Sequence, residues 1–224
     1  MKRITLAIDW YSGTWKWTTA RLLAKKLSYT YLDTWAMYRA VTLYAIRHNL
    51  LEASDQIKAE IVDRITLDFQ YNKETDNFDI YLDSECVEGE IRSPDLWFQL
   101  KHIVTCRPLR EKLVVLQRAF SLWWWVVVDW RDIGTVVYPE AEVKVFMICD
   151  VDVRAERRWK QLKEQWVDTD IEQIKKELIQ RDTTDYLWTD AVNKKAEDAL
   201  VLDTTYLTIQ EQVESIYKKV QTLL

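Results

Sequence analysis

Apolar residues recur along the chain at two different spacings, and the alternation of these spacings predicts strands that alternate with helices. Short apolar runs predict strands at residues 3–8, 29–33, 125–129, 143–148 and 199–203. The runs "WVVVD" and "VKVFMI" are continuous, as in strands buried on both faces of a parallel sheet. Helical spacing follows the first strand at Ala20, Leu23, Ala24 and Leu27, and further helices are expected at about 36–49, 153–165 and 170–181. This order predicts a doubly wound α/β fold.

A different pattern runs from residue 65 to residue 83 ("ITLDFQYNKETDNFDIYLD"), where apolar and polar residues alternate on both sides of a polar turn. This alternation predicts a β-hairpin. Pro94 and Pro108 mark the starts of two further helices, because proline is tolerated in the first helical turn. A last helix is expected to bury Ile209, Val213, Ile216, Val220 and Leu223. We find no internal repeat or linker and expect a single domain over residues 1–224.

Size and charge limit the classes of function. The chain has 224 residues, enough for one α/β domain, and its net charge of −5 provides no basic field for nucleic acid. No apolar run approaches the ~20 residues of a membrane span, and the N-terminus does not resemble a signal peptide. Cys86, Cys106 and Cys149 lie far apart, which suggests reduced thiols. We expect a cytoplasmic monomer without nucleic-acid or membrane partners; self-association through exposed aromatic residues is the alternative.

Glycine and tryptophan occur in abnormal numbers. An average usage of ~7% would give a chain of this length roughly fifteen glycines, but it has three, together with twelve tryptophans. The tryptophans fall mostly at expected strand ends and loops, where turn-forming residues are usual. They are Trp10, Trp15, Trp17, Trp35, Trp97, Trp123, Trp124, Trp125, Trp130, Trp159, Trp166 and Trp188. This placement indicates altered loops more than an enlarged core.

The segment "WYSGTWKW" at residues 10–17 stands between the first strand and a helix, where a phosphate-binding loop has the pattern G-x-x-x-x-G-K-[ST]. The glycines of that pattern admit left-handed backbone angles, and main-chain N–H groups surround the anion. Its lysine reaches the phosphates and its hydroxyl binds magnesium. Of the defining positions only Lys16 is retained, and Ser12, Gly13 and Thr18 are the other residues of a degraded loop. Alone, the segment is better explained as an ordinary strand, turn and helix, and the motif match is weak.

Across its length the chain resembles bacterial cytidylate kinase, a nucleoside monophosphate kinase. The resemblance is carried by "TTARLLAKKL", "YLDTWAMYRAVTLYAIR", "VEGEIRSP", "REKLVVLQRAF", "VVVDWRDIGTVVYPEAEVKVF", "RAERR" and "IQRDTTD". It implies a P-loop NTPase-like three-layer fold with a central parallel sheet, an inserted hairpin-containing substrate-binding subdomain and a short helical lid. The implied subregions are core at 1–60, 120–150 and 197–224, insert at 61–105 and lid at 153–190. The family transfers the γ-phosphate of ATP to CMP or dCMP with magnesium.

The resemblance also implies roles for individual charged residues. Lys16, Arg131 and Arg181 match residues that act on the phosphates and are the candidate catalytic residues. The candidate substrate-binding residues are Asp33, Tyr38, Arg39, Arg110, Arg131, Asp132 and Asp185. Of these, Arg110 and Asp132 match positions that meet the cytosine base, and Asp185 matches an acid near the sugar. Arg157 and Arg158 lie in the expected lid helix. Each residue alone is also explained as a solvated side chain, but the set matches one family in order.

The chain departs from the family where small residues are expected. Trp10, Trp15, Trp35 and Trp130 stand at glycine positions, and Trp17 stands where a hydroxyl binds magnesium. Trp97 and the run 123–125 replace small or turn-forming residues, and Trp188 closes a lid motif that has lost a serine and an arginine. A non-glycine residue in a left-handed conformation costs roughly 1–2 kcal/mol. An indole at position 15 or 17 would also fill the space that a phosphate needs.

These replacements predict that ATP and magnesium bind poorly and that phosphoryl transfer is abolished or severely impaired. CMP or dCMP is expected to bind at most weakly, and no metal ligand is assigned. One alternative is a genuine, weakly active cytidylate kinase with a rearranged loop. A second alternative is a non-catalytic binding module that uses an aromatic surface. The tryptophans could fill the nucleotide pocket as an aromatic plug or point outward as an apolar patch.

Overall fold

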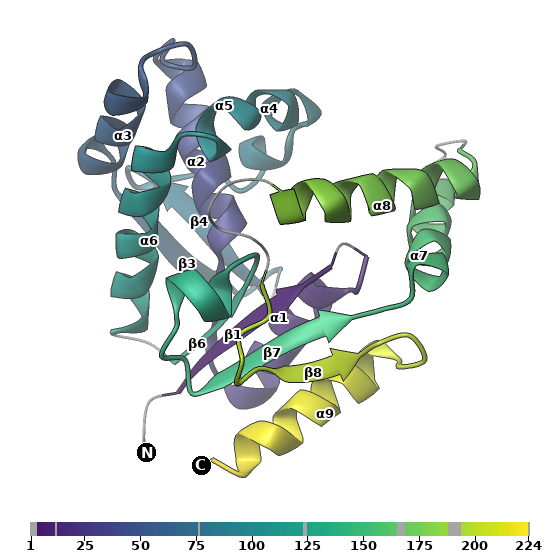
Figure 1. Cartoon of the computed structure of the whole chain (residues 1–224). Helices are drawn as coiled ribbons and strands as arrows, with labels where there is room; N and C mark the ends of the chain where they lie inside the picture. The colour runs from purple at the N-terminus through teal and green to yellow at the C-terminus, as the bar shows by residue number, and fades with distance from the viewer. Residues whose placement is uncertain are drawn as a thin grey trace. The chain divides into compact units, whose positions relative to one another are not determined.

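The computed structural model describes residues 4–11, 13–75, 77–122, 125–164, 169–187 and 194–223. Its internal contacts divide the chain into two compact units. The first unit is formed by Met1–Tyr29 and Trp125–Leu224, and the second unit is formed by Thr30–Trp124. Figure 1 labels helices and strands of both units.

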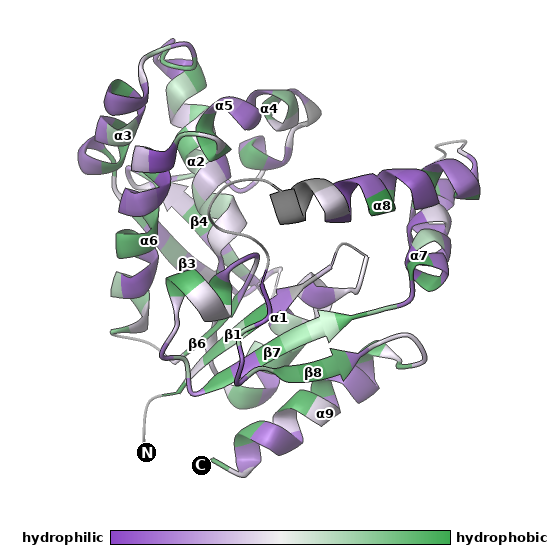
Figure 2. Cartoon of the chain, in the orientation of Figure 1, coloured by the Kyte–Doolittle hydropathy of each residue, from purple (hydrophilic) through white to green (hydrophobic). Residues whose placement is uncertain are grey.

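A parallel sheet forms the centre of the first unit. Its strands here are β1 (Thr5–Trp10), β6 (Val126–Asp129), β7 (Val143–Ile148) and β8 (Leu200–Asp203), in the order β6-β1-β7-β8. All three pairings are parallel, and Ile8 of β1 is in register with Asp129 of β6. The carboxyl ends of β1 and β6 therefore lie side by side. The predicted parallel strands are confirmed, and Figure 2 shows them as hydrophobic.

Helices of the first unit pack on this sheet and on one another. They are α1 (Lys16–Leu27), α7 (Val151–Glu164), α8 (Ile171–Leu187) and α9 (Ile209–Gln221). The hydroxyl of Thr19 in α1 donates a buried hydrogen bond of 2.8 Å to Oε1 of Gln212 in α9. Val213, Ile216 and Val220 of α9 are buried as predicted. The prediction for Leu223 is wrong, because this residue follows the end of α9 and is 45% exposed.

A short π-helical segment, η2 (Ile133–Val137), follows β6 in the first unit. The sequence pattern did not predict it. Asp132 precedes it with a left-handed φ of 59°, a conformation that aspartate tolerates better than most residues. This segment ends the stretch "DWRDIGTVV" at residues 129–137 and directly follows the candidate residues Arg131 and Asp132.

The second unit combines helices with a small antiparallel sheet. Its elements are β2 (Thr30–Asp33), α2 (Thr34–Arg47), α3 (Asp55–Arg64), β3 (Leu67–Asn72), β4 (Asn77–Leu82), β5 (Glu85–Cys86), η1 (Glu90–Arg92), α4 (Pro94–Gln99), α5 (Lys101–Val104) and α6 (Arg107–Ser121). The predicted hairpin is confirmed as β3 and β4, which pair with Leu67 opposite Leu82. Pro94 begins α4, and Pro108 lies in the first turn of α6, as the sequence predicts. None of the helices in the described ranges has the length and apolar content needed to cross a membrane.

Candidate functional site

The loop at the position of the phosphate-binding motif joins β1 to α1. Gly13 has a φ of 87°, and a Cβ atom there would lie 3.1 Å from Cβ of Arg154 in α7. Glycine therefore adopts this backbone angle without strain and leaves room for the close approach of α7. The hydroxyl of the buried Thr14 donates to the carbonyl of Tyr11 at 3.1 Å. Ser12 lies outside the described residues, and of Trp10 the backbone alone is described, as the last residue of β1.

Trp15 has the left-handed conformation expected of a replaced glycine. Its φ and ψ are 61° and 24°, and it caps the N-terminus of α1 without a side-chain hydrogen bond. Such a conformation costs roughly 1–2 kcal/mol in a non-glycine residue. The strain does not extend to the other replaced glycines, because Trp10 and Trp35 lie in a regular strand and helix and Trp130 has no positive φ.

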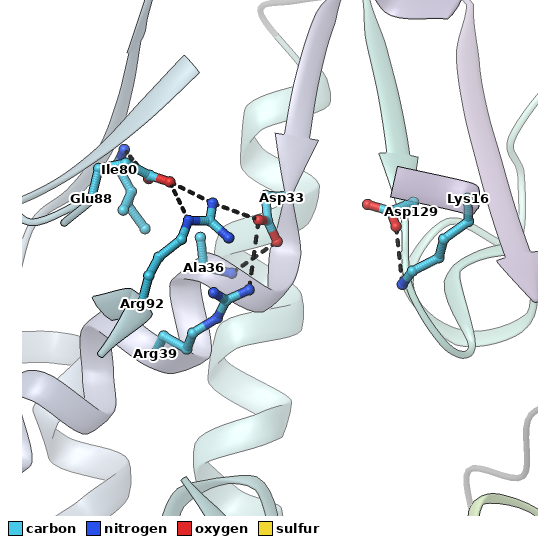
Figure 3. Close-up of polar contacts among 8 residues, drawn as sticks. All are labelled: Lys16, Asp33, Ala36, Arg39, Ile80, Glu88, Arg92 and Asp129. Atoms are coloured by element: carbon cyan, nitrogen blue, oxygen red, sulfur yellow. Dashed lines mark hydrogen bonds and ion pairs between the residues drawn. The ribbon is translucent and has the colours of Figure 1, made fainter. Parts of the chain in front are cut away.

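Lys16 contacts a carboxylate and an indole. Its Nζ lies 3.0 Å from Oδ2 of Asp129, and the two side chains are 12% and 4% exposed. The same Nζ lies 4.2 Å from the centroid of the Trp130 ring. Figure 3 shows the pair of Lys16 and Asp129. Asp129 was missed in the sequence, although its place at the end of an apolar strand is a signal that could have found it. The ammonium group is therefore held by groups of the protein itself.

Three guanidinium groups of the first unit also lie over tryptophan rings. The distances from Cζ to the ring centroid are 4.1 Å for Arg157 over Trp15, 4.7 Å for Arg21 over Trp17, and 5.0 Å for Arg131 over Trp130. Such cation–π contacts contribute ~0.5–1 kcal/mol at exposed positions. Trp15 and Trp17 are 40% and 38% exposed, so neither indole is enclosed in a core. Thr18, the next residue of α1, is half-buried.

Asp9 joins the end of β1 to the η2 segment. Its two carboxylate oxygens accept hydrogen bonds of 2.8 Å from the main-chain N–H groups of Ile133 and Gly134. Burial raises the pKa of Asp9 to about 7, and the charge of Asp132 acts in the same direction. A Cβ atom on Gly134 would lie 3.0 Å from Oδ2 of Asp9, so glycine allows this contact. No sequence pattern indicates the role of Asp9, because that role depends on a contact between residues that are distant in the sequence.

In the second unit, two arginines approach the carboxylate of Asp33. Oδ2 of Asp33 lies 3.8 Å from Arg39 and 3.5 Å from Arg92, while Oδ1 accepts the N–H of Ala36 at 3.0 Å and caps α2. Arg92 also pairs with Glu88 (Figure 3). Burial lowers the pKa of Arg39 despite the nearby Asp33. The buried Nε of Arg39 has no hydrogen-bond partner within the part of the chain that the structure describes. Arg92 was missed because η1 gives no periodic pattern.

Aromatic side chains lie near these charges in the second unit. The Trp35 ring lies 5.8 Å from the Tyr38 ring and 6.3 Å from the Trp97 ring, measured between centroids. Trp97 is 53% exposed and the neighbouring Phe98 is 70% exposed. Trp35 is half-buried and packs against the core of the unit. Trp97 and Phe98 are therefore two consecutive aromatic residues of α4 that are exposed on this unit.

The other candidate residues are placed as follows. Arg181 is half-buried in α8, and Arg110 is half-buried in α6 of the second unit. Arg158 donates to Gln161 within α7 at 2.9 Å. Asp185 lies in α8, but its side chain is not described. Trp188, Trp123 and Trp124 lie outside the described residues. The structure thus brings together Lys16, Trp130 and Arg131 in one unit. In the other unit it brings together Asp33 and Arg39, while Tyr38 contacts Trp35.

Comparison with known proteins identifies relatives over almost the whole chain. A model of the family described as "Cytidylate kinase" matches residues 6–222. A cytidylate kinase from Cytophaga hutchinsonii is 41% identical over 216 residues, which cover 96% of this chain and 92% of the relative. A cytidylate kinase from Parabacteroides distasonis is 40% identical, with coverages of 95% and 94%.

Solved structures extend the similarity at the level of the fold. A shikimate kinase from Bacteroides thetaiotaomicron aligns with a TM-score of 0.51 at 15% identity, covering 98% of this chain and 97% of that chain. The protein TT1252 from Thermus thermophilus aligns with a TM-score of 0.50 at 13% identity, with coverages of 100% and 99%. These likenesses agree with a P-loop NTPase-like α/β fold.

Proposed function

Because the chain belongs to the cytidylate kinase family, we propose that it retains the family fold but has lost effective ATP binding and phosphoryl transfer. The family reaction transfers a phosphoryl group, for which positioning and charge stabilisation supply most of the catalysis. Both depend on cations that are available to the phosphates. We propose that CMP or dCMP binds at most weakly, through the charged residues named above.

The contacts of Lys16 carry this proposal. Its ammonium group is within 3.0 Å of the Asp129 carboxylate and 4.2 Å of the Trp130 ring. A phosphate would have to replace these contacts and leave a buried carboxylate without its cation, which is costly. The neighbouring cations Arg157 and Arg131 similarly lie over indoles. Lys16, Arg131 and Arg157 are therefore engaged within the protein.

The residues at the expected magnesium position support the proposal that the metal binds poorly. In P-loop enzymes magnesium is held by a loop hydroxyl and by an acid at the end of a neighbouring strand. Asp129 is such an acid, but Trp17 supplies no oxygen and Thr18 points about 100° away around the helix. One of the two protein ligands is thus missing, and the other is paired with Lys16. The residues present do not fit a magnesium–ATP complex, and we assign no reaction step to one.

Calorimetric titration with ATP and magnesium tests the proposal, together with an assay of ADP release in the presence of CMP. We expect no saturable heat from ATP and no turnover above background. Saturable ATP binding with magnesium-dependent turnover would overturn the proposal.

A variant that combines Trp10→Gly, Trp15→Gly and Trp17→Ser locates the defect. Recovery of phosphoryl transfer would place it in the loop between β1 and α1. Absence of recovery in a folded variant would place it in the lid or near Trp97. Trp159→Phe, which changes a tryptophan of α7 packed against α8, is the control for removal of an indole elsewhere.

A weakly active cytidylate kinase is the second candidate function. One observation favours it: Lys16 and Asp129 still meet at the adjacent ends of α1 and β6. A loop that rearranged around the indoles could use both groups. Slow turnover that stops when Asp129→Asn is introduced would support this candidate over the first.

A further inference from the structure

The loop between β1 and α1 contacts α7 through aromatic rings as well as through its backbone. Cζ of Arg157 lies 4.1 Å from the centroid of the Trp15 ring, and Cζ of Arg154 lies 5.6 Å from the centroid of the Tyr11 ring. The two arginines are three residues apart, so they share one face of α7. Gly13 lies between Tyr11 and Trp15 in the sequence, and a Cβ atom at Gly13 would lie 3.1 Å from Cβ of Arg154.

The cations of these contacts are themselves fixed. Arg157 donates to the carbonyl of Thr204 at 2.7 Å and to Sγ of Cys149 at 3.3 Å. Arg154 is 6% exposed and pairs with Asp182 of α8 at 2.7 Å. Neither guanidinium can follow a movement of the loop without losing these partners. Each ring is therefore stacked on a cation that is anchored elsewhere in the first unit.

We propose that Tyr11, Trp15, Arg154 and Arg157 form an aromatic latch that holds α7 against the loop. Helical lids of phosphoryl-transfer enzymes move to admit and enclose their substrate. In this chain the latch opposes that movement of α7. This effect is distinct from the filling of the phosphate space by indole side chains. The latch proposal rests on the proposed function in one respect, because it takes the loop between β1 and α1 as the position of the lost phosphate site.

Hydrogen exchange of the protein without nucleotide tests the latch. Amide exchange is measured for peptides that cover residues 149–160 in the wild type and in Trp15→Leu, Trp15→Tyr and Arg157→Gln. Leucine keeps the left-handed strain but removes the aromatic face, whereas tyrosine keeps a face for stacking. We expect exchange about 2- to 5-fold faster in Trp15→Leu and Arg157→Gln, and partial rescue in Trp15→Tyr. The double variant Trp15→Leu/Arg157→Gln should exchange no faster than the faster single variant.

The matched control is Trp17→Leu. Trp17 stacks with Arg21 at 4.7 Å, a contact within α1 that does not reach α7. Its removal should leave exchange at 149–160 unchanged. Unchanged exchange in Trp15→Leu, or an equal effect of Trp17→Leu, would overturn the latch. Hydrogen exchange is measured without nucleotide and reports on the latch alone, whereas ATP titration of the wild type reports on the proposed loss of function, so failure of one can be told from failure of the other.

Discussion

Asp9 shows how one buried carboxylate can organise a segment that lies far away in the sequence. It accepts two main-chain hydrogen bonds from η2, and it is 3% exposed. Hydrogen bonds to the charged form lower its pKa, but the cost of burial is larger and the net shift is upward to about 7. Burial therefore dominates over hydrogen bonding at this residue.

This shift predicts how stability depends on pH. In the unfolded chain Asp9 loses its proton near the ordinary aspartate pKa of 3.8, whereas the folded protein keeps the proton up to a pKa of about 7. Between these values the folded state binds more protons, so its stability falls as pH rises, by at most ~1.4 kcal/mol per pH unit. Above pH 7 this contribution is constant. Urea denaturation of the wild type and of Asp9→Asn between pH 4 and pH 8 measures the contribution of Asp9 to the free energy of unfolding.

In Asp9→Asn the free energy of unfolding should lack the part of its dependence on pH that Asp9 causes. The difference between the wild type and this variant isolates that part. Identical slopes in the two proteins would contradict the prediction. Asp203→Asn is the matched control, because Asp203 ends β8 of the same sheet and its pKa is lowered by hydrogen bonds from Thr205.

At the scale of elements, the contact between α1 and β6 depends on one ion pair. Lys16 and Asp129 are both largely buried. Removal of one partner from a buried pair leaves an uncompensated charge and typically costs about 3–5 kcal/mol. We predict that Lys16→Met lowers the free energy of unfolding by about this amount. Lys16→Met combined with Asp129→Leu should recover part of the loss, because no lone charge then remains.

Chemical denaturation measures both effects. The control is Lys26→Met on the same helix, where the pair with Glu214 is exposed and worth less than about 1 kcal/mol. If Lys16→Met lowers the free energy of unfolding by no more than Lys26→Met does, Lys16 is not a structural residue.

Hydrophobic patterning predicted most elements because their contacts are periodic. The strands β6 and β7 follow from continuous apolar runs, and the β3–β4 hairpin follows from alternation around a turn. The η2 segment did not follow, because its N–H groups bond to the carboxylate of Asp9, which lies far away in the sequence. Asp129 and Arg92 were missed for a related reason. A strand-end acid and an arginine in a short turn acquire a partner only once the register and the fold are known.

At the scale of the whole molecule, charge argues against the binding-module alternative. The net charge is −5, and binding of single strands requires a basic groove beside the aromatic rings. We predict no change in the fluorescence anisotropy of a labelled single-stranded oligonucleotide at low salt. A shift that weakens as salt increases would contradict this and revive the aromatic-module hypothesis.

The first unit is assembled from the two ends of the chain, and this has a consequence for biosynthesis. The neighbours of β1 in this unit are β6 and β7, and α1 is joined to α9 by Thr19 and Gln212. All of these partners are translated after the second unit. The strand β1, the loop at residues 11–15 and the helix α1 therefore leave the ribosome before β6, β7 and α9, against which β1 and α1 pack. We expect this N-terminal segment to be where a growing chain is most open to chaperones and to misassembly.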